Sequence, residues 1–390
     1  MKEWKTYRLG DLIKISSGFP YKGEYIGRGE NYILGMGCVS FKETFLHSGL
    51  RAYSDEAPDR YIAKPGEIVL ATRQQSDNLP ILGMPAIIPH IYEGRKMIIG
   101  ANLYKVLNES NFTNEYIYWL MKSPAYIHHI RSCQTGTTVR MITKANIEDF
   151  TFNAPEEHER KRISDFLWNL ENKIQLNRQI NDNLKQQAQA LYKSWFVDFE
   201  PFKDQEFVDS EIGLIPENWN CTTLSEFISI KYGKDHKKLA DGIIPVFGSG
   251  GLMRYVDTKL HEGESVLIPR KGSLNNVMYV NEAFWTVDTM FYSTPKVENS
   301  CIYAYLFLAN KDLASMNAGS AVPSMTTDIL NNMPIIAPPT EVLKQFNNIC
   351  NVYFSRIHQN NIENANLAKQ RDTLLPKLMS GELKINETDC

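Results

Sequence analysis

Residues 155–199 contain a heptad repeat that is typical of a coiled coil. Spacings of four and three residues select the seam positions Ile163, Leu167, Leu170, Ile174, Asn177, Asn181, Leu184, Ala188, Leu191 and Trp195. An a/d seam held over more than four heptads predicts a long helix that packs against another helix. Two seam residues, Asn177 and Asn181, are polar, and buried asparagine at such positions fixes the register of helix pairing.

The same pattern recurs 183 residues later in the chain. At this displacement Asn177 coincides with Asn360 and Asn181 coincides with Asn364, while Pro155 coincides with Pro338. Because the two helices carry polar residues at the same seam positions, we predict that they pack on each other. In this interpretation Asn177, Asn181, Asn360 and Asn364 set the register, and a pair of ordinary amphipathic core helices is the alternative.

The segments that precede the two helices also resemble each other. Trp219, Leu224, Ile228 and Gly233 repeat Trp4, Leu9, Ile13 and Gly18, and residues 263–267 repeat residues 66–70. Residues 21–110 are rich in strand-forming residues with Gly, Pro and Asn between them, and residues 114–130 are predicted to form one helix. The chain is therefore predicted to be a tandem repeat in which a globular module and a long helix each occur twice.

These patterns predict an α+β fold with a pseudo-twofold arrangement of two globular α/β modules and two long helices. The expected boundaries are 1–153 for the first module, 154–200 for the first helix, 201–215 for an acidic linker, 216–337 for the second module, 338–384 for the second helix and 385–390 for a tail.

Composition limits where the chain can function. No apolar segment approaches the roughly 18 residues of a membrane span, and the N-terminus lacks the apolar core of a signal peptide. The six cysteines are scattered without a CxxC pair, which favours a reducing compartment. We expect a cytoplasmic protein without membrane contact or bound metal. At a net charge of −3, any surface that binds nucleic acid must be local.

Motifs of catalysis are incomplete in this sequence. Gly35-Met36-Gly37 and Gly248-Ser249-Gly250-Gly251 lack the Lys-Ser/Thr of a P-loop and the acidic partner of a dinucleotide site. Glu382-Leu383-Lys384 matches a nuclease ExK sequence in letters alone, and His128-His129 is interpreted as one exposed and one packed helix residue rather than a metal site. We predict that the chain has no catalytic residue and binds no cofactor. A chain that itself methylates or cuts DNA is the less favoured hypothesis.

Polar segments at equivalent places in the two modules suggest contacts with DNA. Arginine is the usual partner of guanine, and glutamine of adenine, whereas hydroxyl groups and loop N–H groups suit phosphates. The candidates in the first module are Arg73, Gln74, Gln75, Thr137, Thr138, Arg140 and Lys144. Those in the second module are Arg270, Lys271, Ser273, Ser320 and Ser324.

The chain resembles the specificity subunits of type I restriction–modification systems over nearly its whole length. The resemblance lies in Trp-x4-Leu at the start of each module, in residues 191–199 followed by 213–219, and in residues 374–383. It implies two target recognition domains, each recognising half of a bipartite, asymmetric site in double-stranded DNA. It also implies that the long helices form an antiparallel coiled coil that separates the domains and sets the spacer.

The resemblance further implies two methyltransferase subunits and two restriction/translocase subunits as partners, with S-adenosylmethionine, ATP and Mg²⁺ bound by them. We expect Trp195, Phe196, Phe199, Leu375, Leu378 and Met379 to contact the methyltransferases. Pro376 and Ser380-Gly381 are expected to break the second helix where the first continues. A coiled-coil scaffold that binds proteins rather than DNA is the alternative function.

Overall fold

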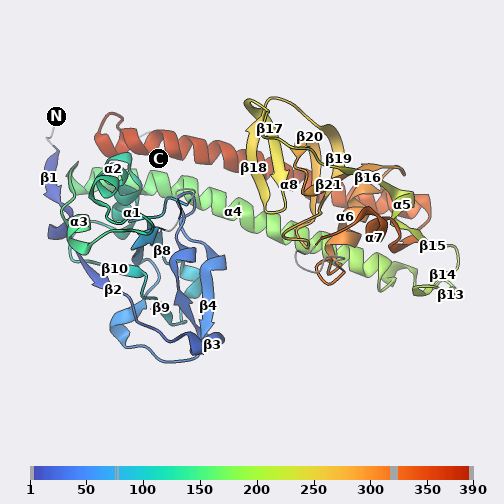
Figure 1. The fold of residues 1–390 in the computed structure, drawn as a ribbon, viewed down its shortest axis with the longest axis horizontal. Helices are drawn as coiled ribbons and strands as arrows, with labels where there is room; N and C mark the ends of the chain where they lie inside the picture. Colours follow the sequence, from blue (N-terminus) through green and yellow to red (C-terminus); the bar gives the residue numbers. More distant parts are fainter. Residues whose placement is uncertain (1–3, 75, 77–78, 317–323, 386–390) are drawn as a thin grey trace. The chain divides into compact units, whose positions relative to one another are not determined.

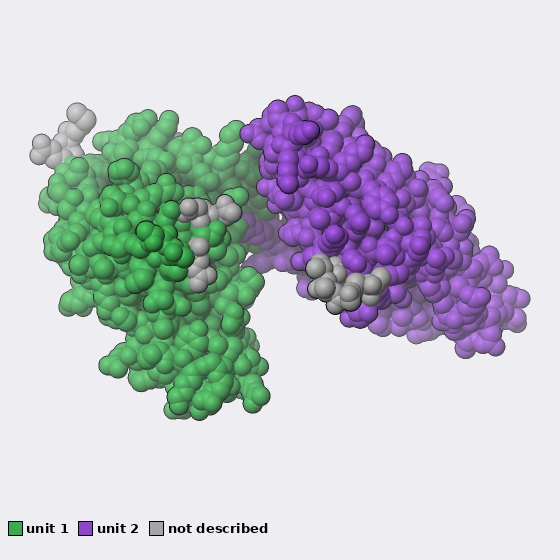
Figure 2. Space-filling model, viewed as in Figure 1, with its two compact units in different colours: residues 1–175, 363–390 green, residues 176–362 purple. Residues whose placement is uncertain are grey.

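The computed structural model describes residues 1–390 except 1–3, 75, 77–78, 317–323 and 386–390. The chain divides into two compact units, residues 1–175 with 363–390 and residues 176–362, coloured separately in Figure 2. Two long helices, α4 (Glu157–Phe196) and α8 (Thr340–Ser380), each contribute one part to both units. Each unit therefore combines one globular module with part of both helices (Figure 1).

The module of the first unit is built mainly from short strands. Its strands are β1 (Lys5–Arg8), β2 (Ile13–Ser17), β3 (Ile26–Leu34), β4 (Leu50–Tyr53), β5 (Ile62–Ala63), β6 (Ile68–Ala71), β7 (Arg73–Gln74), β8 (Pro85–Ile87), β9 (Met97–Ile99), β10 (Leu103–Asn108), β11 (Arg140–Met141) and β12 (Thr151–Ala154). Its helices are α1 (Asn114–Lys122), α2 (Pro124–Cys133) and α3 (Lys144–Glu148).

Two four-stranded sheets, ordered β2-β10-β6-β8 and β4-β3-β9-β5, form the body of this module. The pairs β1-β12 and β7-β11 complete it. Strand β6 has every side chain buried, as expected for a strand covered on both faces. The resulting core continues into the helices, because Ile163 and Leu167 of α4 and Leu375 and Leu378 of α8 belong to it.

The second unit contains the other module. Its strands are β13 (Phe207–Ser210), β14 (Gly213–Pro216), β15 (Asn220–Thr223), β16 (Ile228–Tyr232), β17 (Asp241–Gly248), β18 (Gly251–Val256), β19 (His261–Pro269), β20 (Met278–Thr286), β21 (Met290–Pro295) and β22 (Pro334–Ala337). Its helices are α5 (Leu224–Phe227), α6 (Cys301–Ala309) and α7 (Thr327–Asn331).

A six-stranded sheet, ordered β16-β21-β19-β20-β17-β18, dominates the second module. Helix α6 is buried almost all round, and its Tyr303 packs on Tyr192 and Phe196 of α4. The core also includes Phe346 and Phe354 of α8. As in the first unit, the module and both long helices share one hydrophobic core.

The two long helices run antiparallel within each unit. In the first unit Glu171 of α4 pairs with Arg371 of α8, and Arg162, nearer the start of α4, reaches the carbonyl oxygen of Ile385. In the second unit Asn181 contacts Asn360, and Tyr192, further along α4, packs on Phe346. Residues nearer the C-terminus of α4 thus contact residues nearer the N-terminus of α8. This order confirms the predicted antiparallel coiled coil.

The internal repeat is reproduced in strand register. Lys5 lies opposite Ala154 in β1-β12, and the equivalent Asn220 lies opposite Ala337 in β15-β22. Two matched glycines also share a physical role: a Cβ atom at Gly18 or at Gly233 would lie 2.1 Å from a backbone carbonyl oxygen, that of Gly100 or of Val287. Only glycine permits this close approach of two backbones, so the repeat preserves a packing constraint.

Several local predictions were wrong. The helix predicted for residues 114–130 is two helices, because Ser123 caps a new helix that begins at Pro124. The predicted linker contains the hairpin β13-β14. Helix α8 continues through Pro376 to Ser380 and ends where Gly381 adopts a positive φ. Helix α4 ends at Phe196, the equivalent of Met379, so the two helices end within one residue of each other in the repeat.

Candidate nucleic-acid interface

In the first unit the two segments nominated for DNA contact lie side by side. Strand β7 pairs with β11, with Gln74 opposite Arg140 and Arg73 opposite Met141. The Ile142 amide also donates to the Thr72 carbonyl oxygen, at 3.3 Å. The segment after β6 and the loop that precedes α3 therefore form one two-stranded ribbon at the end of the buried strand β6.

The second unit repeats this arrangement. Lys271 forms a β-bridge with Ser324, and the Met325 amide donates to the Arg270 carbonyl oxygen at 2.9 Å. The threonines that follow, Thr143 and Thr326, occupy equivalent places, and each caps a short helix by accepting from a backbone N–H three residues on. Both modules thus join their two nominated segments by backbone hydrogen bonds.

Side chains of the first ribbon are directed to solvent. Arg73, Thr137 and Thr138 are exposed. Lys144 is half-buried, and its Nζ lies 5.7 Å from the centroid of the Tyr104 ring. Burial raises the pKa of the Tyr104 hydroxyl, and the positive charge of Arg73 opposes this rise. This region therefore presents two cations near the Tyr104 ring and two exposed hydroxyl groups in the adjoining loop.

The second ribbon has a comparable chemistry. Lys271 and Ser273 are exposed. Arg270 is half-buried, lies 5.4 Å from the centroid of the exposed Tyr232 ring, and donates to the carbonyl oxygen of Asp288 at 3.3 Å. An arginine that stacks on an aromatic ring retains several N–H donors for a ligand.

Not every nominated residue can serve as a contact. Gln74 is 7% exposed, and its Oε1 accepts from the Leu82 amide at 3.3 Å, so its side chain supports the ribbon from inside and cannot face a ligand. Gln75 and Ser320 lie outside the described residues. Arg140 and Ser324 are half-buried within the ribbons. Contact of the remaining candidates with DNA stays a prediction.

A basic segment that was not among the predicted contacts lies beside the second ribbon. Lys231, Lys234, Lys237 and Lys238 are all exposed, and Asp235 is the acidic residue among them. The Lys234 amide donates to the Thr286 carbonyl oxygen at 2.9 Å, and the Arg270 amide donates to that of Thr289 at 2.9 Å. The turn formed by residues 286–290 therefore accepts backbone hydrogen bonds from both the basic segment and the second ribbon. The run of four lysines within residues 231–238 is a sequence signal that could have identified it.

The residues predicted to contact the methyltransferases lie in the cores of their own units. Phe196 and Phe199 belong to the core of the second unit, whereas Leu375, Leu378 and Met379 are buried in that of the first. Trp195 is half-buried against Phe202 and Phe346. The ends of the long helices are therefore covered by their own modules, and contact of these residues with the methyltransferases stays a prediction.

Three of the four polar seam residues are buried. Asn177, Asn181 and Asn360 are at most 5% exposed. The Asn360 side-chain amide donates to Oδ1 of Asn181 at 2.8 Å, and the Asn181 amide donates to Oδ1 of Asn361 at 2.9 Å. Asn364 is half-buried. The contacts identify Asn181 as a partner of Asn360 across the coiled coil.

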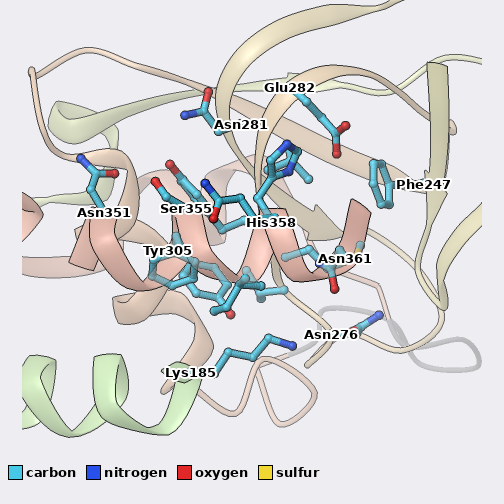
Figure 3. Close-up of a pocket in the computed structure, with 17 residues that line it drawn as sticks. Lys185, Phe247, Asn276, Asn281, Glu282, Tyr305, Asn351, Ser355, His358 and Asn361 are labelled. Carbon is cyan, nitrogen blue, oxygen red and sulfur yellow. The ribbon is translucent and has the colours of Figure 1, made fainter. Parts of the chain in front are cut away.

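A groove of about 520 Å³ lies within the second unit, between the module and the helices (Figure 3). Asn351, Ser355 and His358 of α8 face Asn281 and Glu282 on the opposite side. Its lining is polar amide and aromatic, and it differs in chemistry from the basic ribbon. Across the described residues, no three His, Cys, Asp or Glu side chains gather in a way that could hold a metal ion.

Neither of the long helices, nor any other helix in the described part of the chain, has the length and hydropathy that crossing a bilayer requires. This finding is consistent with the many polar and charged residues of α4 and α8.

The amino-acid sequence of this chain is similar to a known protein family and to several characterised relatives. The family model described as "Type I restriction modification DNA specificity domain" matches residues 1–186 and 216–367. The MjaIX specificity subunit of a type I restriction enzyme from Methanocaldococcus jannaschii is 22% identical, covering 99% of this chain and 95% of the relative. The HindI specificity subunit from Haemophilus influenzae is 23% identical, covering 98% of this chain and 100% of the relative.

Among solved structures, the type I restriction–modification S subunit from M. genitalium is similar in fold. The match has a TM-score of 0.59 at 16% sequence identity and covers 97% of this chain and 96% of that chain. At this identity the similarity concerns the fold, and it extends over both modules and both helices.

Proposed function

Since the chain belongs to the DNA specificity subunits of type I restriction–modification systems, we propose that each of its modules recognises one half of a bipartite, asymmetric DNA site. The observation that carries the proposal is the recurrence of the basic ribbon. In each unit, the arginine-containing segment that follows a buried strand forms backbone hydrogen bonds with a second segment. This second segment precedes the short helix, α3 or α7, that comes before the long helix in the chain. A feature retained in two modules whose main sheets differ in strand number suits a shared ligand.

The ribbons would supply both kinds of contact that DNA recognition needs. Exposed Thr137, Thr138 and Ser273 suit phosphate oxygens, and Arg73, Arg270 and Lys271 suit guanine edges in the major groove. Because the modules differ in the residues at these places, the two half-sites would differ in sequence. The near-neutral charge of the chain fits a complex in which other subunits provide part of the DNA contact.

The long helices would set the spacer between the half-sites. Helix α4 has 40 residues, which corresponds to roughly 60 Å of helix. A buried asparagine pair and a buried ion pair along the seam fix how α4 and α8 align. Within a system of this class the chain would direct two methyltransferase and two restriction/translocase subunits. It would leave S-adenosylmethionine, ATP, Mg²⁺ and the chemistry of adenine methylation and DNA cleavage to them.

A selection experiment tests this function. The chain, assembled with its methyltransferase partner, is incubated with a pool of random-sequence duplexes, and the bound duplexes are sequenced. We expect enrichment of one bipartite motif with a fixed gap. Arg73→Ala should relax one half of the motif and Lys271→Ala the other, each by about tenfold or more at the contacted position.

Lys14→Ala is a matched control, because Lys14 is an exposed cation of the first module at the start of β2 and pairs with Glu109. It should leave the motif unchanged. Enrichment of no motif by the unaltered complex would contradict the proposed function.

A further inference from the structure

The hairpin β17-β18 exposes two large apolar side chains beside its turn. Leu252 is 52% exposed and Met253 is 56% exposed. In the strand pairing, Phe247 lies opposite Leu252 and Val246 lies opposite Arg254, so Met253 is an extra residue that forms a β-bulge. Neighbouring side chains of a regular strand point to opposite faces, and a bulge re-aims them. The bulge allows both side chains to face solvent.

The turn of this hairpin is fixed against the second ribbon. The Asn276 side-chain amide donates to the Ser249 carbonyl oxygen at 2.8 Å. Gly272, between Lys271 and Ser273, packs so closely that a Cβ atom there would lie 2.7 Å from Oγ of Ser249. Leu252 and Met253 therefore follow a turn that touches the segment proposed to contact DNA.

The end of the hairpin next to its turn is held by the turn that also holds the basic segments. The Val287 amide donates to the Phe247 carbonyl oxygen at 3.1 Å, and the Thr286 hydroxyl donates to the same oxygen at 3.2 Å. Turn 286–290 also bonds the backbone of Lys234 and Arg270. An ordered hairpin of this kind can present side chains to a ligand at little entropic cost.

The charges around the two apolar side chains favour a polyanion. Lys234, Lys237, Lys238 and Lys271 are exposed on the neighbouring segments, against the exposed carboxylates of Asp235 and Asp288. In the first unit the connection between β3 and β4 exposes one large apolar side chain, Phe41, at 44%. The strand β3, which pairs in parallel with β9 as β17 pairs with β20, is followed by a 3-10 turn in which Met36 is half-buried.

We infer that Leu252 and Met253 make apolar contacts with thymine in the half-site that the second module recognises, an inference that rests on the proposed function. In the major groove the 5-methyl group of thymine is the apolar feature by which a side chain distinguishes this base. The neighbouring Lys271 would hold the DNA backbone or a base edge, and the two apolar side chains would add a preference for thymine.

The random-duplex selection described above tests the inference with the double variant Leu252→Ser/Met253→Ser in the assembled complex. Both residues are exposed, so the fold should be retained, which thermal unfolding checks. We expect the variant to enrich the same first half-site and the same gap. At one or two thymine positions of the second half-site its preference should fall by about fourfold, the effect of losing contact with one buried methyl group.

A second measurement uses duplexes that carry uracil in place of thymine at those positions. The unaltered complex should bind them about fourfold more weakly, the effect expected for one buried methyl group, and the double variant should bind both duplexes equally. Ile243→Ser is the control, since Ile243 is 87% exposed at the open end of the same hairpin, and it should change neither result.

A motif and enrichment identical to those of the unaltered complex would overturn the inference while leaving the proposed function intact. Loss of assembly with the methyltransferase would also overturn it, because the hairpin would then be a protein-binding surface. If the unaltered complex selects no motif, the proposed function itself fails.

Discussion

At the scale of single residues, the buried asparagines carry the most specific information in the coiled coil. Asn360 is 1% exposed and donates to Oδ1 of Asn181 at 2.8 Å. A buried polar group that loses its partner costs about 1–3 kcal/mol, whereas replacing both partners with apolar groups is close to neutral.

We therefore expect Asn360→Leu alone to lower the free energy of unfolding by about 1–3 kcal/mol. The double variant Asn181→Leu/Asn360→Leu should recover most of this loss, and its helix register should be less strictly defined. Urea denaturation of the single and double variants measures the coupling. Strictly additive effects would contradict a direct pairing of these two side chains.

A second residue-scale prediction concerns Lys122, whose ammonium group is buried and donates to the carbonyl oxygens of Ser40, Phe41 and Glu43 at 2.6, 2.9 and 3.4 Å. Burial, together with the positive charge of Arg371, lowers the pKa of Lys122 to about 7. Between about pH 7 and the usual lysine pKa near 10.5, the unfolded chain binds a proton that the folded chain releases. Stability contributed by this residue should therefore increase with pH.

Lys122→Met removes this titration at similar side-chain length. The stability of the unaltered chain relative to Lys122→Met should rise from pH 7 to pH 10, as followed by urea denaturation of both chains at several pH values. Taking the difference removes the contribution of tyrosines and cysteines that titrate in both chains. A difference that does not depend on pH would mean that Lys122 keeps its proton in the folded state.

At the scale of helices and strands, the sequence supports some conclusions better than others. The heptad seam predicts α4 and α8 because its period depends on local geometry alone, and the internal repeat predicts the equivalent ribbons. The burial of Phe196 and Leu378 could not be predicted in this way, since a seam does not reveal which globular surface covers the end of a helix.

Features that depend on strand pairing also escaped prediction. The bulge at Met253 exists because of the register between β17 and β18, and the burial of Gln74 follows from its place opposite Arg140 in the ribbon. Neither is encoded in a short sequence pattern. The candidate DNA contacts thus lie on segments that the structure brings together, while the orientation of each side chain required the fold.

An element-scale prediction follows from the place where the compact units divide. The divisions fall between Gln175 and Leu176 in α4 and between Ile362 and Glu363 in α8. Inserting seven residues at both places keeps the a/d seam in phase, because seven residues are one heptad. The insertion adds roughly 10 Å of helix, about three base-pair steps of duplex DNA at ~3.4 Å each.

We expect the selected motif to keep both half-sites and to gain about three base pairs in its gap, as measured by the random-duplex selection. Inserting the heptad into α4 alone is the control, and it should weaken the coiled coil because the additional turn has no partner. An unchanged gap with the double insertion would exclude the helices as the determinant of spacing.

At the scale of the whole molecule, the two modules come from separate parts of the sequence, and each has its own strands and its own hydrophobic core. Each module shares its core with parts of both long helices, as Ile163 and Leu375 do in the first unit and Tyr192 and Phe346 in the second. A module can therefore be exchanged for another only if the incoming module retains an apolar surface for these helix residues.

This condition gives the last prediction. Replacing residues 1–153 with the corresponding module of a specificity subunit that has apolar residues at the equivalents of Ile163, Leu167, Leu375 and Leu378 should yield a folded chain. Its selected motif should change in one half-site and retain the other half-site and the gap. Replacing residues 216–337 instead should change the opposite half. A simultaneous change of both halves in either exchange would mean that the modules recognise DNA jointly. The twofold repeat would then be a property of the fold alone and would not assign one half-site to each module.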